Sequence, residues 1–462
     1  MRDRRQSNIE RLRQEEFDVL IVGGGINGAG IARDLTLREA GLNVALVEKH
    51  HFSSGTSGKN SQLIHGGLRY LKYFDFALVR EALHERATLL RMAPDLVRPL
   101  QFLIPCYGRF DRLFYGAGLT LYDALSGSRS IGHHRALSQA QAIALEPGLA
   151  PDGLRAGLLF YDAGVHSARF TIENILDAET RGACVANYVE VDRTAGEILA
   201  TDTLSGERFP VRARRMVDAT GAWSTGGPLR LVRGSHLIFP RIQKGDEALA
   251  YFDEQGRIIF LIPWGENDDL TLVGTTDVDH QGGPDDVRIS AEETAYLVSV
   301  VRRLFPSYRG EPVSSYSSLR PLIAESGESA TSTSREHRIW ETSDGVLHIA
   351  GGKYTTYRRM SEELVDALLQ ELRPGRSLPC RTAETPLNTA QIPSDPVARI
   401  RMAVEREFAR RLSDLLYVST YWGYERLMQR EWVEPLAREM GSLLDWTPER
   451  IEAEMRGVGA RP

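Results

Sequence analysis

Three glycines near the start of the sequence stand at a spacing that can bind a dinucleotide. Gly23, Gly25 and Gly28 follow the pattern G-x-G-x-x-G, and the acidic Glu48 lies 20 residues beyond the last of them. In such a motif the glycines allow a tight turn, a close approach of the backbone to a pyrophosphate, and close packing of a helix on a strand, while the carboxylate accepts hydrogen bonds from ribose hydroxyls. These four residues predict a dinucleotide site without indicating which dinucleotide binds.

The elements expected around the glycines are those that such a site requires. The apolar run 17–22 predicts a buried strand, a helical pattern covers 26–40, and residues 43–48 predict a second strand. The helix would begin at the glycines, so its free N–H groups and partial positive charge would face the phosphates. The alternative is an ordinary βαβ unit with a glycine turn.

Length and composition predict a soluble globular protein of two or three packed units. The 462 residues are 42% hydrophobic and 26% charged, and the net charge of −6 gives no reason to expect a nucleic-acid partner. The widely spaced Cys106, Cys184 and Cys380 have no metal-ligand spacing, so we expect buried thiols in a reducing cytoplasm and no metal. We expect no signal peptide, and the most apolar stretch, 113–125, is too short to span a bilayer and contains Asp123.

Patterns further along the chain predict that it leaves the nucleotide-binding unit for a second, sheet-rich unit and then returns. Residues 231–320 contain short strands with regular turns and one helix at 290–304, which is typical of a mainly antiparallel sheet. A last buried strand at 345–350 and a helix at 355–371 bring the chain back. Residues 1–16 predict a charged, loosely attached helix or a disordered tail.

A series of motifs runs along most of the chain, at 22–31 (VGGGINGAGI), 63–71 (LIHGGLRYL), 91–94, 219–223, 233–236, 262–264, 274–277, 316–321 and 351–358. In their sequence and order these motifs resemble those of the FAD-dependent glycerol-3-phosphate dehydrogenases, which belong to the D-amino-acid-oxidase-like flavoproteins. The resemblance covers about residues 16–375.

The resemblance implies an α/β (α+β) fold of three units. These are a Rossmann-type FAD-binding domain of the D-amino-acid-oxidase or glutathione-reductase kind, an antiparallel-sheet substrate domain and a short C-terminal helical domain. The expected boundaries are 16–95, 161–230 and 336–377 for the FAD-binding domain, 96–160 and 231–335 for the substrate domain, and 386–462 for the C-terminal domain.

The resemblance also implies that the dinucleotide is FAD, bound noncovalently and extended along the first domain. Thr56 and Ser57 would lie by the phosphates, Val189 by the adenine, and Gly352 and Thr355 near the flavin ring. The cofactor-binding residues that the resemblance implies are Gly23, Gly25, Ile26, Asn27, Gly28, Glu48, Lys49, Thr56, Ser57, Ser61, Leu63, His65, Gly66, Gly67, Val189, Thr220, Gly221, Gly352, Lys353, Tyr354 and Thr355.

The reaction implied is removal of a hydride from the secondary alcohol carbon of sn-glycerol 3-phosphate to flavin N5, with electrons passed to a quinone or other acceptor. His236 is the first candidate base because imidazole titrates near neutral pH. The alternatives are a histidine bonded within a sheet, and His65 lying against the flavin. His236, Arg320 and Lys353 are expected to be catalytic.

A phosphate dianion needs several fixed donors, and the planar fork of arginine suits it. Thr276 and Asp277 could orient substrate hydroxyls, although Gly-Thr-Thr-Asp is also a natural turn at a strand end. The expected substrate-binding residues are Arg69, Tyr70, Thr276, Asp277, Arg320, Arg335 and Lys353.

Three departures from the family pattern leave other functions open. Gln62 stands where the family commonly has a lysine, which would exchange a charge beside the flavin, His166 and Ser167 replace two acidic residues, and the region after residue 385 looks short. The alternatives are a flavoenzyme for another polyol phosphate, a 2-hydroxy acid or an amine, and a non-catalytic FAD-binding protein. We expect a cytoplasmic protein, with any membrane contact peripheral and on the inner face, and a homodimer stays open.

Overall fold

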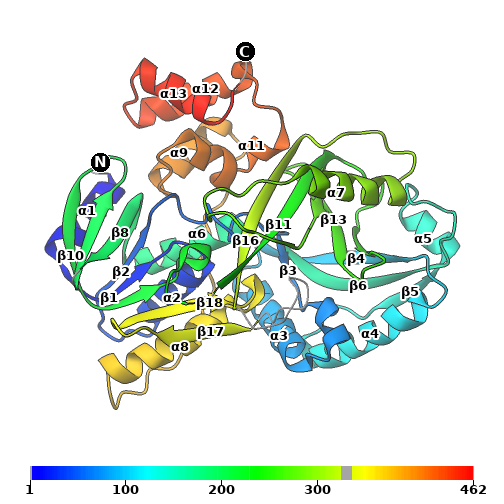
Figure 1. Cartoon of the computed structure of the whole chain (residues 1–462), viewed down its shortest axis with the longest axis horizontal. Coiled ribbons are helices and arrows are strands. Elements are labelled where there is room, and N and C mark those ends of the chain that lie inside the picture. Colours follow the sequence, from blue (N-terminus) through cyan, green and yellow to red (C-terminus); the bar gives the residue numbers. More distant parts are fainter. Residues whose placement is uncertain (1–2, 195, 228, 324–335, 461–462) are drawn as a thin grey trace.

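The computed structural model describes residues 3–194, 196–227, 229–323 and 336–460. Two sheets lie side by side, and a group of helices from the end of the chain packs beside both of them (Figure 1). The chain builds each sheet from segments that are far apart in the sequence, which is the alternation that the sequence predicted.

The first sheet has a parallel core with β1 in its middle. The strand order is β17-β18-β10-β1-β2-β7, and β8 and β9 extend it at β10. Strands β1, β2, β7, β10 and β18 run parallel, as expected for strands rich in apolar residues and covered on both faces. The strands are β1 (Glu16–Val22), β2 (Val44–Glu48), β7 (Cys184–Asn187), β8 (Val189–Thr194), β9 (Glu197–Asp202), β10 (Arg208–Asp218), β17 (His337–Glu341) and β18 (Val346–Gly351).

Three helices pack together beside this sheet, namely α2 (Ile26–Leu37), α6 (Ser167–Thr180) and α8 (Tyr357–Leu372). Gly30 lets α2 and α8 approach closely, because a Cβ at this position would lie 2.4 Å from Ser361 Oγ. Helix α2 therefore begins at the glycine turn and is fixed along its length by its neighbours.

The second sheet is mainly antiparallel, as the sequence predicted. Its order is β15-β11-β14-β13-β12-β4-β6-β3, with β16 paired to β11 and β5 to β6, and only β12 and β4 run parallel among the described pairs. The strands are β3 (Leu63–Ile64), β4 (Val97–Cys106), β5 (Arg135–Ser138), β6 (Ala156–Val165), β11 (Leu229–Pro240), β12 (Ala248–Phe252), β13 (Ile258–Trp264), β14 (Leu270–Gly274), β15 (Val278–Asp279) and β16 (Ser314–Ile323).

Helices cover this sheet and separate its strands along the chain. The expected helix at 290–304 is α7, whose apolar face is buried against the sheet, and its N-cap Ser290 forms a capping box with Glu293. Helix α7 spans Ala291–Leu304. The remaining helices before the C-terminal region, some of which flank the first sheet, are η1 (Leu68–Tyr73), α3 (Phe76–Met92), α4 (Asp111–Ser126), η2 (Gly127–Arg129), α5 (Gln139–Leu145), η3 (Gly221–Trp223) and η4 (Tyr354–Thr356).

The C-terminal region is helical and has an apolar cluster of its own, as expected. Asp395 and Thr447 cap two of its helices, each followed by a proline in the first turn. The elements are α9 (Pro396–Glu405), α10 (Leu412–Asp414), the π-helical segment η5 (Leu415–Ser419), α11 (Trp422–Glu425), α12 (Arg430–Leu443) and α13 (Pro448–Gly457). The domain boundaries given above stay a prediction.

The start of the chain differs from expectation because it is firmly attached. Residues Arg4–Gln14 form helix α1, in which Ile9 and Leu12 are fully buried. Arg5, one turn earlier on the same face, pairs with the buried Asp202 at 2.8 Å. The charged sequence hid this amphipathic face, whose contacts with β7 and β10 hold the helix in place.

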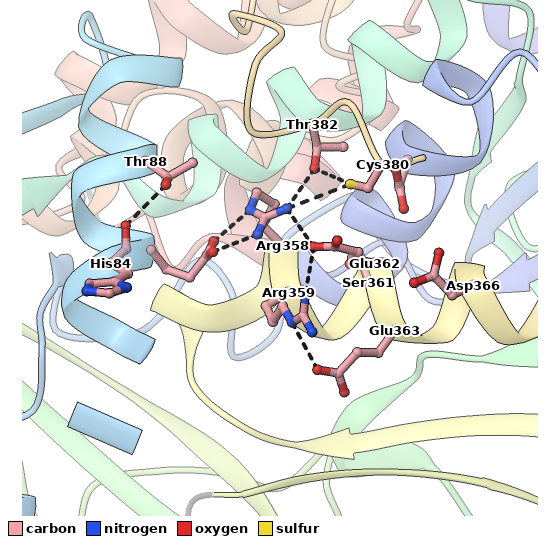
Figure 2. Close-up of polar contacts among 12 residues, drawn as sticks. His84, Thr88, Arg358, Arg359, Ser361, Glu362, Glu363, Asp366, Cys380 and Thr382 are labelled. Atoms are coloured by element: carbon pink, nitrogen blue, oxygen red, sulfur yellow. Dashed lines mark hydrogen bonds and ion pairs between the residues drawn. The ribbon is translucent and has the colours of Figure 1, made fainter. Parts of the chain in front are cut away.

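A buried ion pair joins helix α8 to helix α3 (Figure 2). Arg358 donates two hydrogen bonds of 2.7 Å to the Glu85 carboxylate of α3, and a third, of 3.0 Å, to Glu362. The same guanidinium donates to Thr382 Oγ1 at 3.2 Å, which also ties down the segment after α8. No helix in the described part of the chain is long and apolar enough to cross a membrane.

Candidate active site

A cavity of about 680 Å³ lies between the two sheets and is lined by residues of both. The glycine turn and the loop after β2 form one part, and β11, β13, β16 and the segment after β18 form another. The cofactor residues expected from the sequence that line it are Gly23, Gly25, Ile26, Asn27, Glu48, Lys49, Thr56, Ser57, Ser61, Leu63, His65, Gly67, Val189, Thr220, Gly221, Gly352, Lys353, Tyr354 and Thr355. Among the candidate substrate and catalytic residues, the cavity also brings together Tyr70, His236, Asp277 and Arg320.

The glycine turn has the shape that a bound pyrophosphate needs. Gly23 has a φ of +116°, a conformation that L side chains rarely adopt. A Cβ at Gly28 would lie 2.0 Å from the Gly23 carbonyl oxygen, so only glycine lets α2 approach β1 here. Gly25 is the N-cap of α2 and provides no side-chain cap, which leaves the start of the helix open toward the cavity.

Two side chains hold this turn against the loop that follows β2. Glu48 accepts a hydrogen bond from Gly24 N–H at 2.7 Å and another from His50 N–H at 2.9 Å. Ser57 Oγ accepts from Ile26 N–H at 2.9 Å. A carboxylate has about four lone-pair sites, so Glu48 can still accept from ribose hydroxyls. The glycine cradle, the open helix start and this carboxylate fit the adenosine-diphosphate half of FAD.

At the other end of the cavity Arg320 of β16 is fixed by three contacts. It donates to Asp277 Oδ1 at 3.0 Å, to Thr275 Oγ1 at 3.0 Å and to the Thr276 carbonyl at 3.2 Å. On the neighbouring strand, Gly234 leaves room for the guanidinium, since a Cβ there would lie 2.5 Å from it and would displace it. With 23% of its side chain exposed, Arg320 offers a positioned positive charge to an anion in the cavity.

His236 lies on β11, next to the strands that carry Arg320 and the Thr275–Asp277 turn. Its ring packs on Tyr316 with 5.0 Å between centroids, and its Nε2 is 2.9 Å from Ser61 Oγ. Burial, and then the charge of Arg320, lower the pKa of His236 to about 3. The imidazole is therefore neutral at neutral pH and holds a lone pair that can accept a proton.

Lys353 follows β18 and its ammonium lies 4.0 Å from the centroid of the Tyr70 ring, a cation–π contact. Thr355 joins this segment to the loop at His65, since its Oγ1 accepts from the His65 N–H and donates to the His65 carbonyl, each at 3.2 Å. Two segments almost 300 residues apart in the chain are thus joined at the end of the cavity where the flavin ring is expected. Among the described residues, no cluster of three His, Cys, Asp or Glu side chains is arranged to hold a metal ion.

Comparisons with known proteins agree with this geometry. Residues 18–358 match a family model described as FAD dependent oxidoreductase. The chain is 37% identical over 423 residues to a glycerol-3-phosphate dehydrogenase of Synechocystis sp., which covers 83% of this chain and 75% of that protein. The chain belongs to the FAD-dependent glycerol-3-phosphate dehydrogenase family. Its cofactor is FAD, as the sequence predicted.

Two further relatives support this assignment. An aerobic glycerol-3-phosphate dehydrogenase of Staphylococcus haemolyticus is 34% identical over 411 residues, which cover 83% of this chain and 73% of that protein. The fold is similar to the crystal structure of the glycerol-3-phosphate dehydrogenase from Bacillus halodurans complexed with FAD, with a TM-score of 0.80 and 25% identity, over 99% of this chain and 97% of that one. The expected fold class is confirmed.

Three of the residues that the family resemblance placed at the site do not line the cavity, and two others have side chains that are not described. Gly28 and Gly66 do not line the cavity, and Gly66 N–H donates to Tyr122 Oη at 2.8 Å. Thr276 Oγ1 is turned away from the cavity and donates to Glu293 Oε1 at 2.6 Å. Arg335 is outside the described residues. The backbone of Arg69 lies in η1, but its side chain is not described.

Gln62 differs from expectation, because its side chain does not lie beside the flavin site. It is buried, and its Oε1 accepts from Ser167 N–H at the start of α6 at 2.9 Å. Gln62 has a φ of +56°, which turns its side chain toward that helix. In this chain Gln62 therefore links the loop before β3 to the start of α6 and does not line the cavity.

The sequence missed a set of residues that line the cavity from the strands of the second sheet. Asp162 of β6 is buried, pairs with Arg86 at 2.6 Å and accepts from Tyr122 Oη at 2.8 Å. Burial raises the pKa of Asp162 and outweighs the opposing charge of Arg86. An acidic residue in the apolar run 156–165 was the available signal. The others on these strands are Phe160, Ala250, Ile258, Phe260 and Ser318, and Trp223 lines the cavity from η3.

Proposed function

We propose that this chain is an FAD-dependent dehydrogenase that oxidises sn-glycerol 3-phosphate to dihydroxyacetone phosphate. The observation that carries the proposal is the pairing, on neighbouring strands, of a fixed arginine with a neutral histidine in a cavity that also holds a dinucleotide cradle. An alcohol that carries a phosphate needs both groups, one for the anion and one for the hydroxyl proton. The relatives that share this family name agree with the substrate.

Arg320 and Lys353 bind and orient the phosphate. Arg320 is held by Asp277 and Thr275 before the substrate arrives, so little ordering is needed when the phosphate binds. Lys353, which also lines the cavity and lies over the Tyr70 ring, adds a second positive charge. FAD supplies the hydride acceptor when it is bound.

His236 takes the hydroxyl proton. Its neutral ring is in the base form, and Ser61 Oγ fixes its Nε2 and thereby its orientation. A phosphate dianion on Arg320 offsets the positive charge that lowers the pKa of His236, so substrate binding makes the imidazole a stronger base. The base therefore becomes more effective once the correct substrate is present.

Anaerobic reduction of the flavin tests the proposal. The purified protein is loaded with FAD, its yellow absorbance is recorded, and glycerol 3-phosphate is added without oxygen. Rapid bleaching is expected. Bleaching only by another polyol phosphate, a 2-hydroxy acid or an amine would select the alternative substrate class, and no bleaching by any of them would leave an FAD-binding protein without this chemistry. A protein that cannot be loaded with FAD would contradict every version.

We further propose that the protein is cytoplasmic and makes peripheral contact with the inner face of the cell membrane, from which a quinone or another acceptor would take the electrons. Phe74, Phe110, Leu113 and Phe114 are 62–78% exposed, on and beside η1 and α4. Phe110, Leu113 and Phe114 are close together in the sequence at the start of α4, and exposed apolar side chains that form a patch are typical of an interaction surface. The exposed Arg109 and Arg112 beside them suit an anionic lipid surface.

Co-sedimentation with vesicles containing an anionic phospholipid tests this contact. Serine at Leu113 and Phe114 is expected to abolish binding, whereas serine at Ile392 and Val397, which are exposed in the C-terminal region, serves as the matched control. If the wild-type protein is instead a homodimer that ignores vesicles, a second copy covers the patch. If only the control variant fails to bind the vesicles, the membrane contact lies in the C-terminal region and not at α4.

A further inference from the structure

We propose that Tyr421, in the C-terminal helical region, is a positioning residue of the active site. It holds the loop before β3 in the shape that presents Ser61 to His236. The inference rests on the proposed function, because the role of Ser61 is to orient the base. Tyr421 lies beyond residues 18–358, the part that matches the family model, so the family match does not assign it this role.

The hydroxyl of Tyr421 reaches from one region of the protein into another. Its side chain is buried, with 3% of the residue exposed. Its Oη donates to the Gly58 carbonyl at 2.8 Å and accepts from Ala168 N–H, at the start of α6, at 3.2 Å. Both partners lie outside the C-terminal helices. The hydroxyl therefore links this region to the loop and to α6, which a phenylalanine could not do.

The loop that Tyr421 contacts is held at three successive carbonyl groups. Tyr316 Oη donates to the Asn60 carbonyl at 2.7 Å, and Ser318 Oγ donates to the Lys59 carbonyl at 2.6 Å, both from β16. Tyr421 Oη donates to the carbonyl of Gly58, the residue before Lys59. The residue after Asn60 is Ser61, whose Oγ lies 2.9 Å from His236 Nε2. Within the loop, Asn60 and Gln62 make further hydrogen bonds, including one from Gln62 Nε2 to the Gly58 carbonyl at 3.4 Å. From outside the loop, three hydroxyl groups hold the residues before Ser61, and one of them comes from the C-terminal region.

Tyr421 is itself held firmly enough to act as an anchor. The His166 ring stacks on it with 4.2 Å between centroids and an interplanar angle of 5°, and Trp264 packs at 5.6 Å. His166 in turn caps α6, because its Nδ1 accepts from Arg169 N–H at 3.2 Å. Tyr421 has a φ of +65°, a conformation that is uncommon for a residue with a side chain. The surrounding packing fixes both its backbone and its ring.

Tyr421→Phe and the matched control Tyr424→Phe test the proposal in the FAD-loaded protein. Tyr424 is a buried neighbour whose ring lies 5.9 Å from that of Tyr421, and its described contacts with β16 are made by its ring and its carbonyl oxygen. Hydrogen exchange of the backbone N–H groups of 58–62, followed by mass spectrometry, is expected to become about tenfold faster in Tyr421→Phe and to stay at the wild-type rate in Tyr424→Phe. This measurement needs no substrate, so it stands even if glycerol 3-phosphate does not reduce the flavin.

Kinetics provide the second measurement. Tyr421→Phe is expected to lower kcat about tenfold, because Ser61 no longer orients the base His236. The KM for glycerol 3-phosphate should stay within twofold of the wild-type value, because the contacts of Arg320 are unchanged. In a double-mutant cycle with Ser61→Ala, the loss from Tyr421→Phe is expected to shrink to less than twofold, since both changes act through the same contact. Independent losses that multiply in the double variant would refute the coupling.

Two outcomes of the exchange experiment would overturn the proposal. The first is unchanged exchange at 58–62 in Tyr421→Phe, and the second is an equal increase in Tyr424→Phe, which would indicate general loosening of the core. If Tyr421→Phe does not fold, His166→Asn takes its place, because asparagine can still cap α6 but removes the ring that packs on Tyr421. Faster exchange at 58–62 is then expected, and a wild-type rate would refute the role of Tyr421.

Discussion

Replacing Arg320 with alanine should weaken substrate binding while leaving FAD in place. The residue lines the cavity from β16, and its described hydrogen bonds are to the turn at 275–277 and not to the glycine turn. Removal of the side chain also takes away the ion pair with Asp277, of which only 5% is exposed. The double variant Arg320→Ala/Asp277→Asn separates these effects, because it removes the leftover charge and keeps the loss of the phosphate contact.

The size of the effect follows from the geometry. A hydrogen bond to a charged group contributes about 1.5–3 kcal/mol, and 1.36 kcal/mol corresponds to about tenfold in rate. Loss of one contact between Arg320 and phosphate should thus lower kcat/KM by roughly 10- to 150-fold. Because 23% of the side chain is exposed, solvent screens part of the interaction, and the lower half of this range is expected.

Steady-state kinetics and flavin absorbance measure the two halves of this prediction. KM for glycerol 3-phosphate should rise, the flavin absorbance per protein should match the wild type, and Arg320→Lys should restore part of the loss because it keeps the charge without the planar fork. The double variant should remain as impaired as Arg320→Ala. Loss of FAD, or a change in kcat/KM below threefold, would refute the assignment of Arg320 to the phosphate.

Three further predictions concern the base, the cofactor and the first helix. His236→Gln should lower kcat about 10²- to 10⁴-fold with FAD content unchanged, and a smaller loss in stopped-flow reduction would exclude it as the base. Removal of FAD should lower the Tm, and FAD at 100 times its Kd should restore about 2.7 kcal/mol in thermal unfolding; an unchanged Tm would contradict the assigned site. Arg5→Ala should reduce the free energy of unfolding by about 3–5 kcal/mol because Asp202 is left buried and charged. Burial raises the pKa of Asp202, but Arg5 and the hydrogen bonds of Asp202 outweigh burial and hold the pKa below the ordinary carboxyl value. The stabilisation is therefore fully present above the ordinary carboxyl pKa and is lost as the pH falls through the lowered pKa. Urea unfolding of the wild type and Arg5→Ala at two pH values measures this loss, and a difference between them that does not change with pH would contradict it.

The parts of the site that could be predicted from the sequence are those in which neighbours in the chain decide the structure. The glycine turn, the start of α2 and the carboxylate at the end of β2 lie within about thirty residues, and local sterics fix them. Arg320 and His236 were found through motifs. Their closeness in space, however, follows from the pairing of β11 with β16, which no local pattern predicts.

Long-range pairing explains what the sequence missed. Phe160 and Phe260 line the cavity because β4 lies between β6 and β12 in the second sheet, a register that depends on the whole sheet. Tyr421 reaches Gly58 across more than 360 residues. Helix α1 looked detachable because its charges dominate its composition, whereas four buried side chains, Arg5, Asn8, Ile9 and Leu12, decide its attachment.

The alternation of the chain between two sheets sets the order in which the protein can be completed during synthesis. Strand β10 needs β18 as its neighbour, and β18 is made only after the second block of the antiparallel sheet. Synthesis runs from the N-terminus, so the nucleotide-binding sheet waits with one open edge until residue 351 has left the ribosome. Lys353 and Thr355 follow at once, and Tyr421 comes later still. The lining of the cavity can therefore be complete only after residue 355 has been synthesised, although the glycine turn is made among the first thirty residues.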